Sequence, residues 1–282
     1  DNEQDEDRLS LRTTSNSSLL VELISAGAKR PFFCVPPLTG SGLVFQTLAQ
    51  HLGSDRKLFG FNAPGLDTDT PPCDRIEVLA SRLIEVMRRV VPEGPYCVGG
   101  YSFGAFVAFE MARMLRRSGQ TVAACILMDP PGAAVSSDAS RLIAMSQLFA
   151  MNIDVAAFEA LNRDEQVAAM ASSVGEMLML PSELGESNNQ LRLYRAHLYA
   201  LLDYVPKPYD GSIIVLRTEG TLSLAAKAGL FPNDPTFGWG ALCAQGARTY
   251  EIPGYHLTSL LEPFVADAAC TLREVLSLAD EV

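Results

Sequence analysis

The sequence predicts an α/β fold: a mostly parallel central sheet flanked by helices, with a helical insertion that we interpret as a lid. Three observations support this prediction. From Pro31 onward, short apolar runs alternate with amphipathic stretches, a pattern typical of parallel strands joined by crossover helices. Residues 134–205 interrupt this alternation without a clear strand. The 282 residues are 48% hydrophobic, which is enough to build one large core.

The strand predictions rest on short apolar runs that are bounded by turn residues. In chain order, these runs cover 31–36, 57–61, 95–99, 122–128, 212–217 and 247–252. Amphipathic patterns between the runs predict helices near 42–52, 74–91, 103–118 and 263–278. The third helix is expected to end at Ser118-Gly119, because glycine tolerates the left-handed conformation that often follows a helix.

The insertion at 134–205 carries helical patterns at 140–151 and 187–203, so we expect a helical lid between two strands of the sheet. Five of the nine methionines of the chain fall inside it. Flexible thioethers suit a surface that accepts irregular apolar ligands, and they suit the packing of the lid's own core equally well. The sequence leaves both interpretations open for Met145, Met151, Met170, Met177 and Met179.

The ends of the chain predict the domain organisation. Residues 1–18 are acidic and then rich in serine and threonine, with few large apolar groups to bury, so we predict a flexible linker or tail. Residues 19–282 are expected to form one domain that includes the lid.

Composition excludes several classes of function. A net charge of −11 argues against nucleic acid as a partner, since such binders need clustered lysine and arginine. No apolar stretch approaches the roughly 20 residues that span a bilayer, and no secretory signal opens the chain, so we expect neither a membrane partner nor export. The six cysteines lack zinc-ligand spacing, which favours a reducing cytoplasm and no metal site.

The strongest motif is Gly100-Tyr101-Ser102-Phe103-Gly104, a G-x-S-x-G sequence between a predicted strand and a predicted helix. In this context the motif is typical of the nucleophile elbow of the α/β-hydrolase fold. Glycines are needed on both sides of the serine because the strand turns sharply into the helix. We therefore predict Ser102 as a nucleophile for acyl transfer.

A serine hydroxyl needs a base within hydrogen-bond reach. Of the three histidines, His256 lies in a turn after the strand 247–252 and before the C-terminal helix, the place where α/β-hydrolases carry their base. We interpret His51 and His197 as structural, because they lie at the end of a predicted helix and within a lid helix.

The base needs an acid that holds its tautomer. Asp129 ends the strand 122–128 and is followed by two prolines, which we expect to hold it extended. Glu219 ends the next strand, a position that many α/β-hydrolases use for the acid, so it is the alternative.

A tetrahedral intermediate needs two backbone N–H donors aimed at its oxyanion. One comes from the residue after the nucleophile, Phe103. The other is expected from the loop 36–40, where Leu38 has the first free N–H after two prolines. The alternative is that this loop is only a rigid turn.

At these residues the sequence resembles the type I thioesterase domains of non-ribosomal peptide synthetases and polyketide synthases, from about residue 30 to the end of the chain. This sequence departs from the family's pattern at two places. The family often has His-Pro where this chain has Pro36-Pro37, and often an acidic residue where it has Tyr255. The resemblance rests on Phe33-Cys34-Val35-Pro36-Pro37 with Gly40 and Gly42, Gly99-Gly100-Tyr101-Ser102-Phe103-Gly104, Asp129, and Pro253-Gly254-Tyr255-His256 before Glu262-Pro263.

The resemblance implies Asp129, not Glu219, as the acid, and it implies chain release at the end of a megasynthase. An acyl or peptidyl carrier protein would deliver an acyl, peptidyl or polyketide chain as a phosphopantetheine thioester. Ser102 would take it up as an ester, for hydrolysis or macrocyclisation, with no cofactor or metal. The alternatives are a free-standing editing (type II) thioesterase, a general carboxylesterase, and a non-catalytic ligand-binding scaffold.

Overall fold

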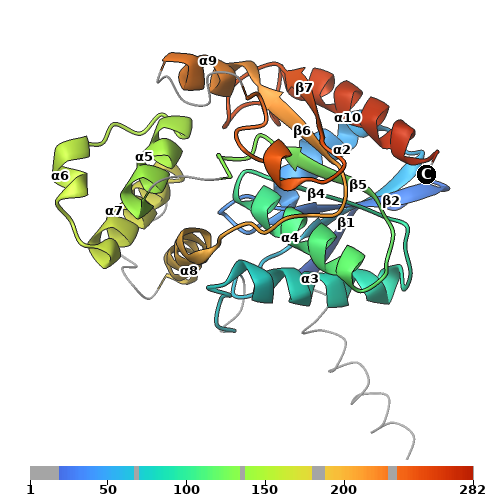
Figure 1. Ribbon diagram of the computed structural model, residues 1–282, viewed down its shortest axis with the longest axis horizontal. Helices are drawn as coiled ribbons and strands as arrows, with labels where there is room; N and C mark the ends of the chain where they lie inside the picture. Colours follow the sequence, from blue (N-terminus) through green and yellow to red (C-terminus); the bar gives the residue numbers. More distant parts are fainter. Residues whose placement is uncertain (1–18, 67–69, 134–136, 180–187, 228–233, 282) are drawn as a thin grey trace, which may run out of the picture.

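The computed structural model describes residues 19–66, 70–133, 137–179, 188–227 and 234–281. The predicted linker or tail at 1–18 lies outside the described residues and stays a prediction. Figure 1 shows a central sheet with helices on both faces and a group of helices set to one side.

The described residues contain a seven-stranded sheet in the order β1-β3-β2-β4-β5-β6-β7. All six predicted strands are present, and every neighbouring pair among them is parallel. The prediction missed β1, which pairs with β3 in the antiparallel direction at the edge of the sheet. The strands are β1 (Leu20–Ile24), β2 (Lys29–Val35), β3 (Arg56–Phe61), β4 (Tyr96–Tyr101), β5 (Val122–Met128), β6 (Ile213–Thr218) and β7 (Ala247–Ile252).

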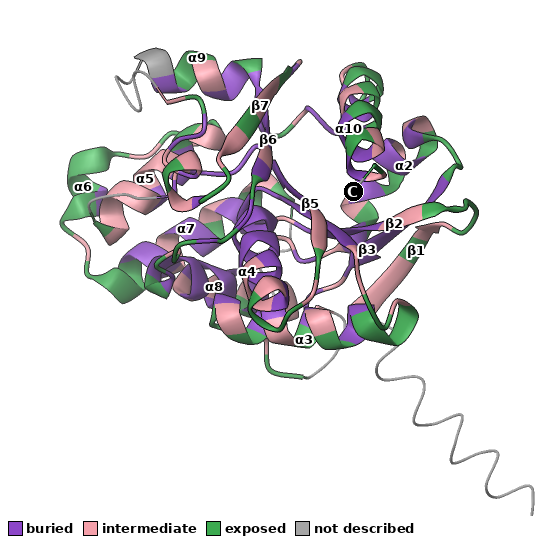
Figure 2. Cartoon of the chain, turned by 45° about the vertical axis from the view of Figure 1, so that its right-hand side comes forward, coloured by how far each residue is buried: buried purple, intermediate pink, exposed green. Residues whose placement is uncertain are grey.

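Two hydrophobic clusters cover the two faces of the sheet. On one face, α2 (Gln46–Leu52) and α10 (Val265–Ala279) pack together, preceded by the short 3-10 helix η2 (Gly42–Phe45). On the other face lie α3 (Ile76–Val90) and α4 (Phe103–Arg117). β4 is fully buried. Figure 2 shows that the edge strand β1 is mostly of intermediate burial. Among the described residues, no helix is long and apolar enough to cross a membrane.

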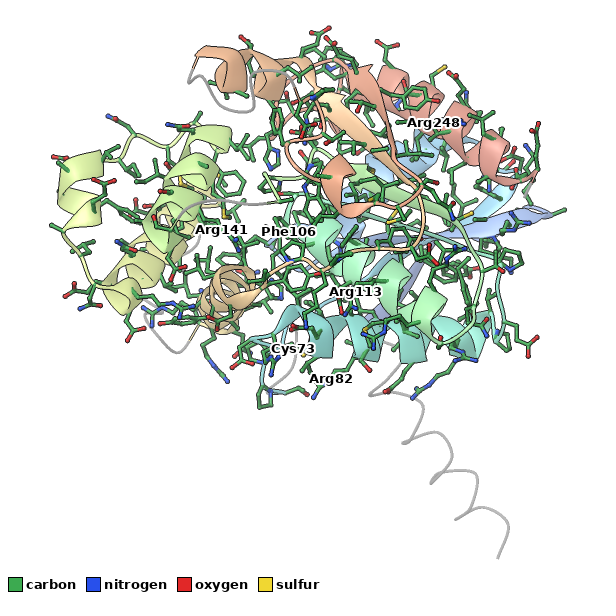
Figure 3. All side chains as sticks on the ribbon, viewed as in Figure 1. Cys73, Arg82, Phe106, Arg113, Arg141 and Arg248 are labelled. Atoms are coloured by element: carbon green, nitrogen blue, oxygen red, sulfur yellow. The ribbon has the colours of Figure 1, made fainter. Side chains whose placement is uncertain are left out.

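The insertion is helical, as predicted, and we call its helices α5 (Asp138–Leu148), α6 (Val155–Glu159), α7 (Arg163–Met177) and α8 (Asn189–Asp203) the lid. The lid shares one hydrophobic cluster with α3 and α4. Arg141 on α5 donates to the carbonyls of Leu201 and Tyr204 at the end of α8, which ties the first and last lid helices together (Figure 3). Met145 and Met170 are buried inside the lid, whereas Met179 is 90% exposed.

Two further short helices follow the sheet strands. α9 (Glu219–Lys227) begins directly after β6, and the 3-10 helix η4 (Gly240–Leu242) precedes β7. Neither was predicted. Trp239, just before η4, is fully buried against Phe106 and Phe109 of α4, and its indole N–H donates to the Pro131 carbonyl at 2.8 Å.

Candidate active site

Ser102 occupies the sharp turn between β4 and α4, with a φ of 57° and a ψ of −120°. The two glycines of the motif allow this turn. A Cβ on Gly100 would lie 2.0 Å from the Gly104 carbonyl oxygen, and a Cβ on Gly104 would lie 2.3 Å from the Val35 carbonyl oxygen. The G-x-S-x-G motif is therefore required by the close approach of backbone to backbone.

The predicted site residues meet at one edge of the sheet, because parallel strands place their carboxyl ends together. Ser102 follows β4 and Asp129 follows β5, and the backbone N–H of Ser102 donates to the Met128 carbonyl at 3.0 Å. Leu38 follows β2, and His256 follows β7. Ser102 and His256, which are 154 positions apart in the sequence, are therefore neighbours in the fold.

Three of these side chains form one hydrogen-bonded chain. His256 Nδ1 lies 2.7 Å from Asp129 Oδ2, and His256 Nε2 lies 2.8 Å from Ser102 Oγ. A carboxylate only accepts, so the Nδ1–H of the imidazole donates to Asp129. The lone pair of Nε2 then faces the serine hydroxyl, which is the arrangement a base needs to accept its proton.

Asp129 is held by more than the imidazole. Its carboxylate accepts from the Thr218 N–H at 3.1 Å, the Thr218 hydroxyl at 3.1 Å and the Thr221 hydroxyl at 2.7 Å. The prediction that the following prolines hold Asp129 extended was wrong, since its φ is 42°. The hydrogen bonds from Thr218, at the end of β6, and from Thr221, in the first turn of α9, outweigh the preference for an extended backbone before proline.

The alternative acid, Glu219, is not part of the hydrogen-bonded series Ser102–His256–Asp129. It is exposed at the first position of α9. Its neighbours Thr218 and Thr221 face inward and bind Asp129 instead, so the end of β6 supplies donors to the acid and not the acid itself.

A buried arginine accompanies the acid. Arg217 is fully buried on β6, and its guanidinium lies 3.6 Å from Asp129 Oδ1. Burial alone would raise the pKa of Asp129, but the bond from His256, the charges of His256 and Arg217 and the Thr221 hydroxyl hold that pKa below its usual value. Burial lowers the pKa of Arg217 to about 10, and Asp129 opposes that shift. Sequence reasoning missed Arg217, because nothing in the pattern of β6 marks its orientation.

Aromatic rings enclose the imidazole of His256. The Tyr101 ring stacks on it at 5.3 Å between centroids, and the ring of Phe149, at the end of α5, lies tilted against it at 5.5 Å. Ser102 is 1% exposed and His256 is 2% exposed. The structure is therefore closed to solvent at these two side chains, and the lid contributes Phe149 to the cover over His256.

The two predicted oxyanion donors lie beside the serine turn. Phe103 is the first residue of α4, where backbone N–H groups have no partner within the helix. The loop 36–40 that carries Leu38 lies against the same turn, because Gly104 packs on the Val35 and Pro36 carbonyls. Gly40 N–H donates to the Pro37 carbonyl at 2.9 Å and closes this loop.

The two remaining histidines differ in their distance from the site. His51 ends α2 and pairs with the exposed Glu262 at 2.7 Å, away from Ser102. His197, in the middle of α8, is buried against Leu38 and Phe103. No pattern in the sequence marks this lid residue as a contact of the predicted oxyanion donors.

Comparison with known proteins places the site in a family. Residues 30–263 match the model of the thioesterase domain. The chain belongs to the thioesterase domain family. Its members act on thioester bonds, and the resemblance seen in the sequence is confirmed.

The curated relatives of this thioesterase domain are large synthases. Chondramide synthase of Chondromyces crocatus is 28% identical over 94% of this chain, which covers 7% of that protein. Indigoidine synthase of Dickeya dadantii is 42% identical over 40% of this chain, and the matched part is 8% of that protein. The chain thus spans a small part of the length of the relatives it matches.

Solved structures share the fold of this thioesterase domain. The NocB thioesterase domain from the nocardicin cluster, in covalent complex with a fluorophosphonate nocardicin G analogue, has a TM-score of 0.68 at 22% identity; 92% of this chain and 99% of that chain are covered. The thioesterase domain that cyclises the lipopeptide surfactin has a TM-score of 0.60 at 19% identity; 94% of this chain and 98% of that chain are covered. The α/β-hydrolase fold with a helical lid is therefore the fold of this chain.

Proposed function

We propose that this thioesterase domain releases acyl chains through an ester on Ser102, with His256 as base and Asp129 as the acid that holds it. The observation that carries the proposal is the continuous hydrogen-bonded chain, at 2.8 Å from Ser102 to His256 and 2.7 Å from His256 to Asp129. The fixed position of Asp129 among Thr218, Thr221 and Arg217 supports its role, since the carboxylate stays charged and oriented.

The reaction runs in two halves. In the first, Ser102 Oγ attacks the thioester carbonyl while its proton passes to His256 Nε2, and the N–H groups of Leu38 and Phe103 stabilise the oxyanion. The C–S bond then breaks, and the imidazolium returns its proton to the departing thiol. In the second half, water or a nucleophile within the acyl chain gives a proton to His256 and attacks the ester carbonyl. The bond between the acyl carbon and Ser102 Oγ then breaks, and the imidazolium returns the proton to Oγ, which frees Ser102.

The relatives support a proposal for the substrate class. Chondramide synthase and indigoidine synthase are far longer than this chain, which matches only a small part of each. We propose that the acyl, peptidyl or polyketide chain arrives as a thioester on the phosphopantetheine arm of a carrier protein. A chain-release domain of a larger synthase fits these relatives better than a free-standing editing enzyme. No step of the reaction calls for a metal or an organic cofactor.

Release from a loaded carrier tests the proposal. A carrier protein carrying a thioester-bound acyl chain is mixed with the wild-type domain and with Ser102→Ala, and intact-protein mass spectrometry follows both partners. We expect the wild type to gain the acyl mass transiently on Ser102 and to release the chain, and Ser102→Ala to do neither. The control His51→Gln changes a histidine away from the site and is expected to behave as the wild type.

Two outcomes contradict the proposal. Release by Ser102→Ala at the wild-type rate would exclude Ser102 as the nucleophile. Rapid hydrolysis of 4-nitrophenyl esters by the wild type, without any release from loaded carriers, would instead indicate a general carboxylesterase.

A further inference from the structure

His197 lies on the lid but contacts both proposed oxyanion donors. α8 is the lid helix that contacts α3 and α4, and it lies next to them in Figure 1. His197 is near the middle of this helix. The side chain is 1% exposed. A buried histidine in a lid helix has a cost of desolvation, so its contacts call for an explanation.

The first contact is a hydrogen bond to the loop 36–40. His197 Nδ1 lies 2.9 Å from the Leu38 carbonyl oxygen. A carbonyl only accepts, so the Nδ1–H donates and the neutral ring leaves Nε2 as a lone pair. Nε2 has no hydrogen-bond partner among the described residues. His197 also lines a small cavity, together with Asn62 and mostly apolar residues that include Phe61 and Leu79.

The second contact is with the residue after the nucleophile. The His197 ring stacks on the Phe103 ring, with centroids 4.5 Å apart and planes 18° apart. Phe103 is the first residue of α4, so a ring that fixes its side chain also fixes the start of the helix. His197 thus touches both proposed donors, Leu38 in the loop after β2 and Phe103 at the start of α4.

Two hydrogen bonds and the packing of α8 restrain the backbone of the loop 36–40. Gly40 N–H donates to the Pro37 carbonyl, and in a trans peptide the N–H of Leu38 points opposite to that carbonyl. The hydrogen bond from His197 fixes the next peptide, through the Leu38 carbonyl. A Cβ on Gly40 would lie 2.7 Å from Leu193 Cδ2 and 3.5 Å from His197 Cε1, so α8 also closes the outer side of the loop.

We propose that His197 is a positioning residue that couples the lid to the oxyanion hole: its Nδ1–H holds Leu38, its ring holds Phe103, and both backbone donors keep their aim only while α8 is docked. This inference rests on the proposed acyl-transfer function. Lid closure and oxyanion stabilisation are then one event, because the same side chain contributes to both. An acyl donor that leaves α8 undocked meets a nucleophile without a complete oxyanion hole.

Three substitutions separate the hydrogen bond from the ring. His197→Asn places an amide N–H near the position of Nδ1 and keeps the donor to Leu38. His197→Gln places its amide near Nε2 and loses that donor, and His197→Phe keeps a ring but donates nothing. Asparagine and glutamine form a matched pair in polarity, so the comparison stands even where the phenylalanine variant does not fold.

The assay is hydrolysis of 4-nitrophenyl butyrate, with rates normalised to the fraction of Ser102 that a fluorophosphonate labels at completion. Removal of one oxyanion donor costs about 10²- to 10³-fold in kcat, so misaligning it in His197→Gln and His197→Phe is expected to lower kcat by about 10- to 100-fold with KM changed by less than about 3-fold. We expect His197→Asn to lower kcat by less than about 10-fold, because the donor to Leu38 remains and only the ring contact with Phe103 is lost.

A purely structural role gives a different result. All three variants would then unfold at lower urea concentrations, and kcat per labelled site would stay within about 3-fold of the wild type. That result overturns the inference, and so does an equal loss of kcat in all three variants, since the hydrogen bond would not matter. Ser102→Ala is assayed beside these variants and tests the proposed function separately from the role of His197. An inactive Ser102→Ala supports the proposed function, whereas wild-type activity in Ser102→Ala contradicts both the proposed function and the inference on His197.

Discussion

The guanidinium of Arg217 lies 3.6 Å from the carboxylate of Asp129, and both side chains are fully buried. Arg217 also donates to the Pro130 carbonyl and stacks over the Phe237 ring, with its Cζ 3.9 Å from the ring centroid. The cation is therefore fixed from two further directions beside the proposed acid. A buried carboxylate with a fixed cation stays ionised, as a residue that orients an imidazolium must.

We expect Arg217→Met to destabilise the protein by about 3–5 kcal/mol, because it leaves the charge of Asp129 buried with one partner fewer. Urea unfolding measures this loss. Arg217→Lys is expected to lose less, since a cation remains near the carboxylate. The variant Arg113→Met is a matched control, because Arg113 pairs with the buried Glu110 on α4 (Figure 3) and has no contact with Asp129.

The control separates stability from catalysis. Arg113→Met should lose stability but keep kcat per folded molecule, whereas Arg217→Met should lose both. Equal kcat in the two variants would show that Arg217 only stabilises the fold.

The acid is tested by a second pair of variants. We expect Asp129→Asn to lower kcat by about 10³- to 10⁴-fold, because an amide no longer holds the base in the required tautomer. Glu219→Gln should leave kcat within about 3-fold, since Glu219 is exposed at the start of α9 and has no part in the hydrogen-bonded chain. Steady-state hydrolysis of an acyl-pantetheine thioester measures both. A large loss in Glu219→Gln with an active Asp129→Asn would reverse the assignment.

Much of the fold could be predicted because the sheet is parallel and buried. Buried parallel strands are nearly continuous apolar runs, so the six runs stand out in the sequence, together with the amphipathic helices α2, α3, α4 and α10 that follow strands of the sheet. β1 did not stand out, because an antiparallel edge strand buries only part of its surface. α9 was missed because its nine residues carry a weak apolar pattern next to a glycine.

The candidate site was predictable where chemistry demands a motif. Ser102 and His256 lie in turns that can be recognised from adjacent glycines, because the backbone makes such sharp turns only where a side chain is absent. Asp129 could be ranked but not separated from Glu219 by the pattern alone, because both end strands at the same edge of the sheet. Arg217 and His197 were out of reach, because their roles depend on which way a side chain points from β6 and from α8.

Phe149 covers His256 in the closed structure, so its removal should open the site. We expect Phe149→Ala to increase the rate at which a fluorophosphonate labels Ser102 by several-fold, since the ring lies 5.5 Å from the imidazole and Ser102 is 1% exposed. Phe158→Ala is the control, because Phe158 is also a buried lid phenylalanine but belongs to α6. Labelling at the wild-type rate in Phe149→Ala, or equal increases in both variants, contradicts a specific cover over His256.

Acid should weaken the protein through His197 in a defined window. Burial lowers the pKa of His197 to about 4, although its bond to the Leu38 carbonyl opposes this, and the value in the unfolded chain is about 6.5. Between these two pH values the unfolded chain binds a proton that the folded protein does not, so stability falls as the pH falls. The loss across this window is about 3 kcal/mol, and it is complete only below pH 4.

Urea unfolding of the wild type and of His197→Asn at several pH values between 7 and 4 measures this contribution. Asparagine does not titrate, so the difference in the free energy of unfolding between the two proteins should shift by about 3 kcal/mol in favour of the variant as the pH falls. Taking the difference between the two proteins cancels the contribution of the carboxylates to the pH dependence. This includes the contribution of Asp129, whose pKa is below its usual value. A difference that does not change with pH would mean that His197 binds its proton equally in the folded and unfolded protein, and that it is not held neutral against Leu38.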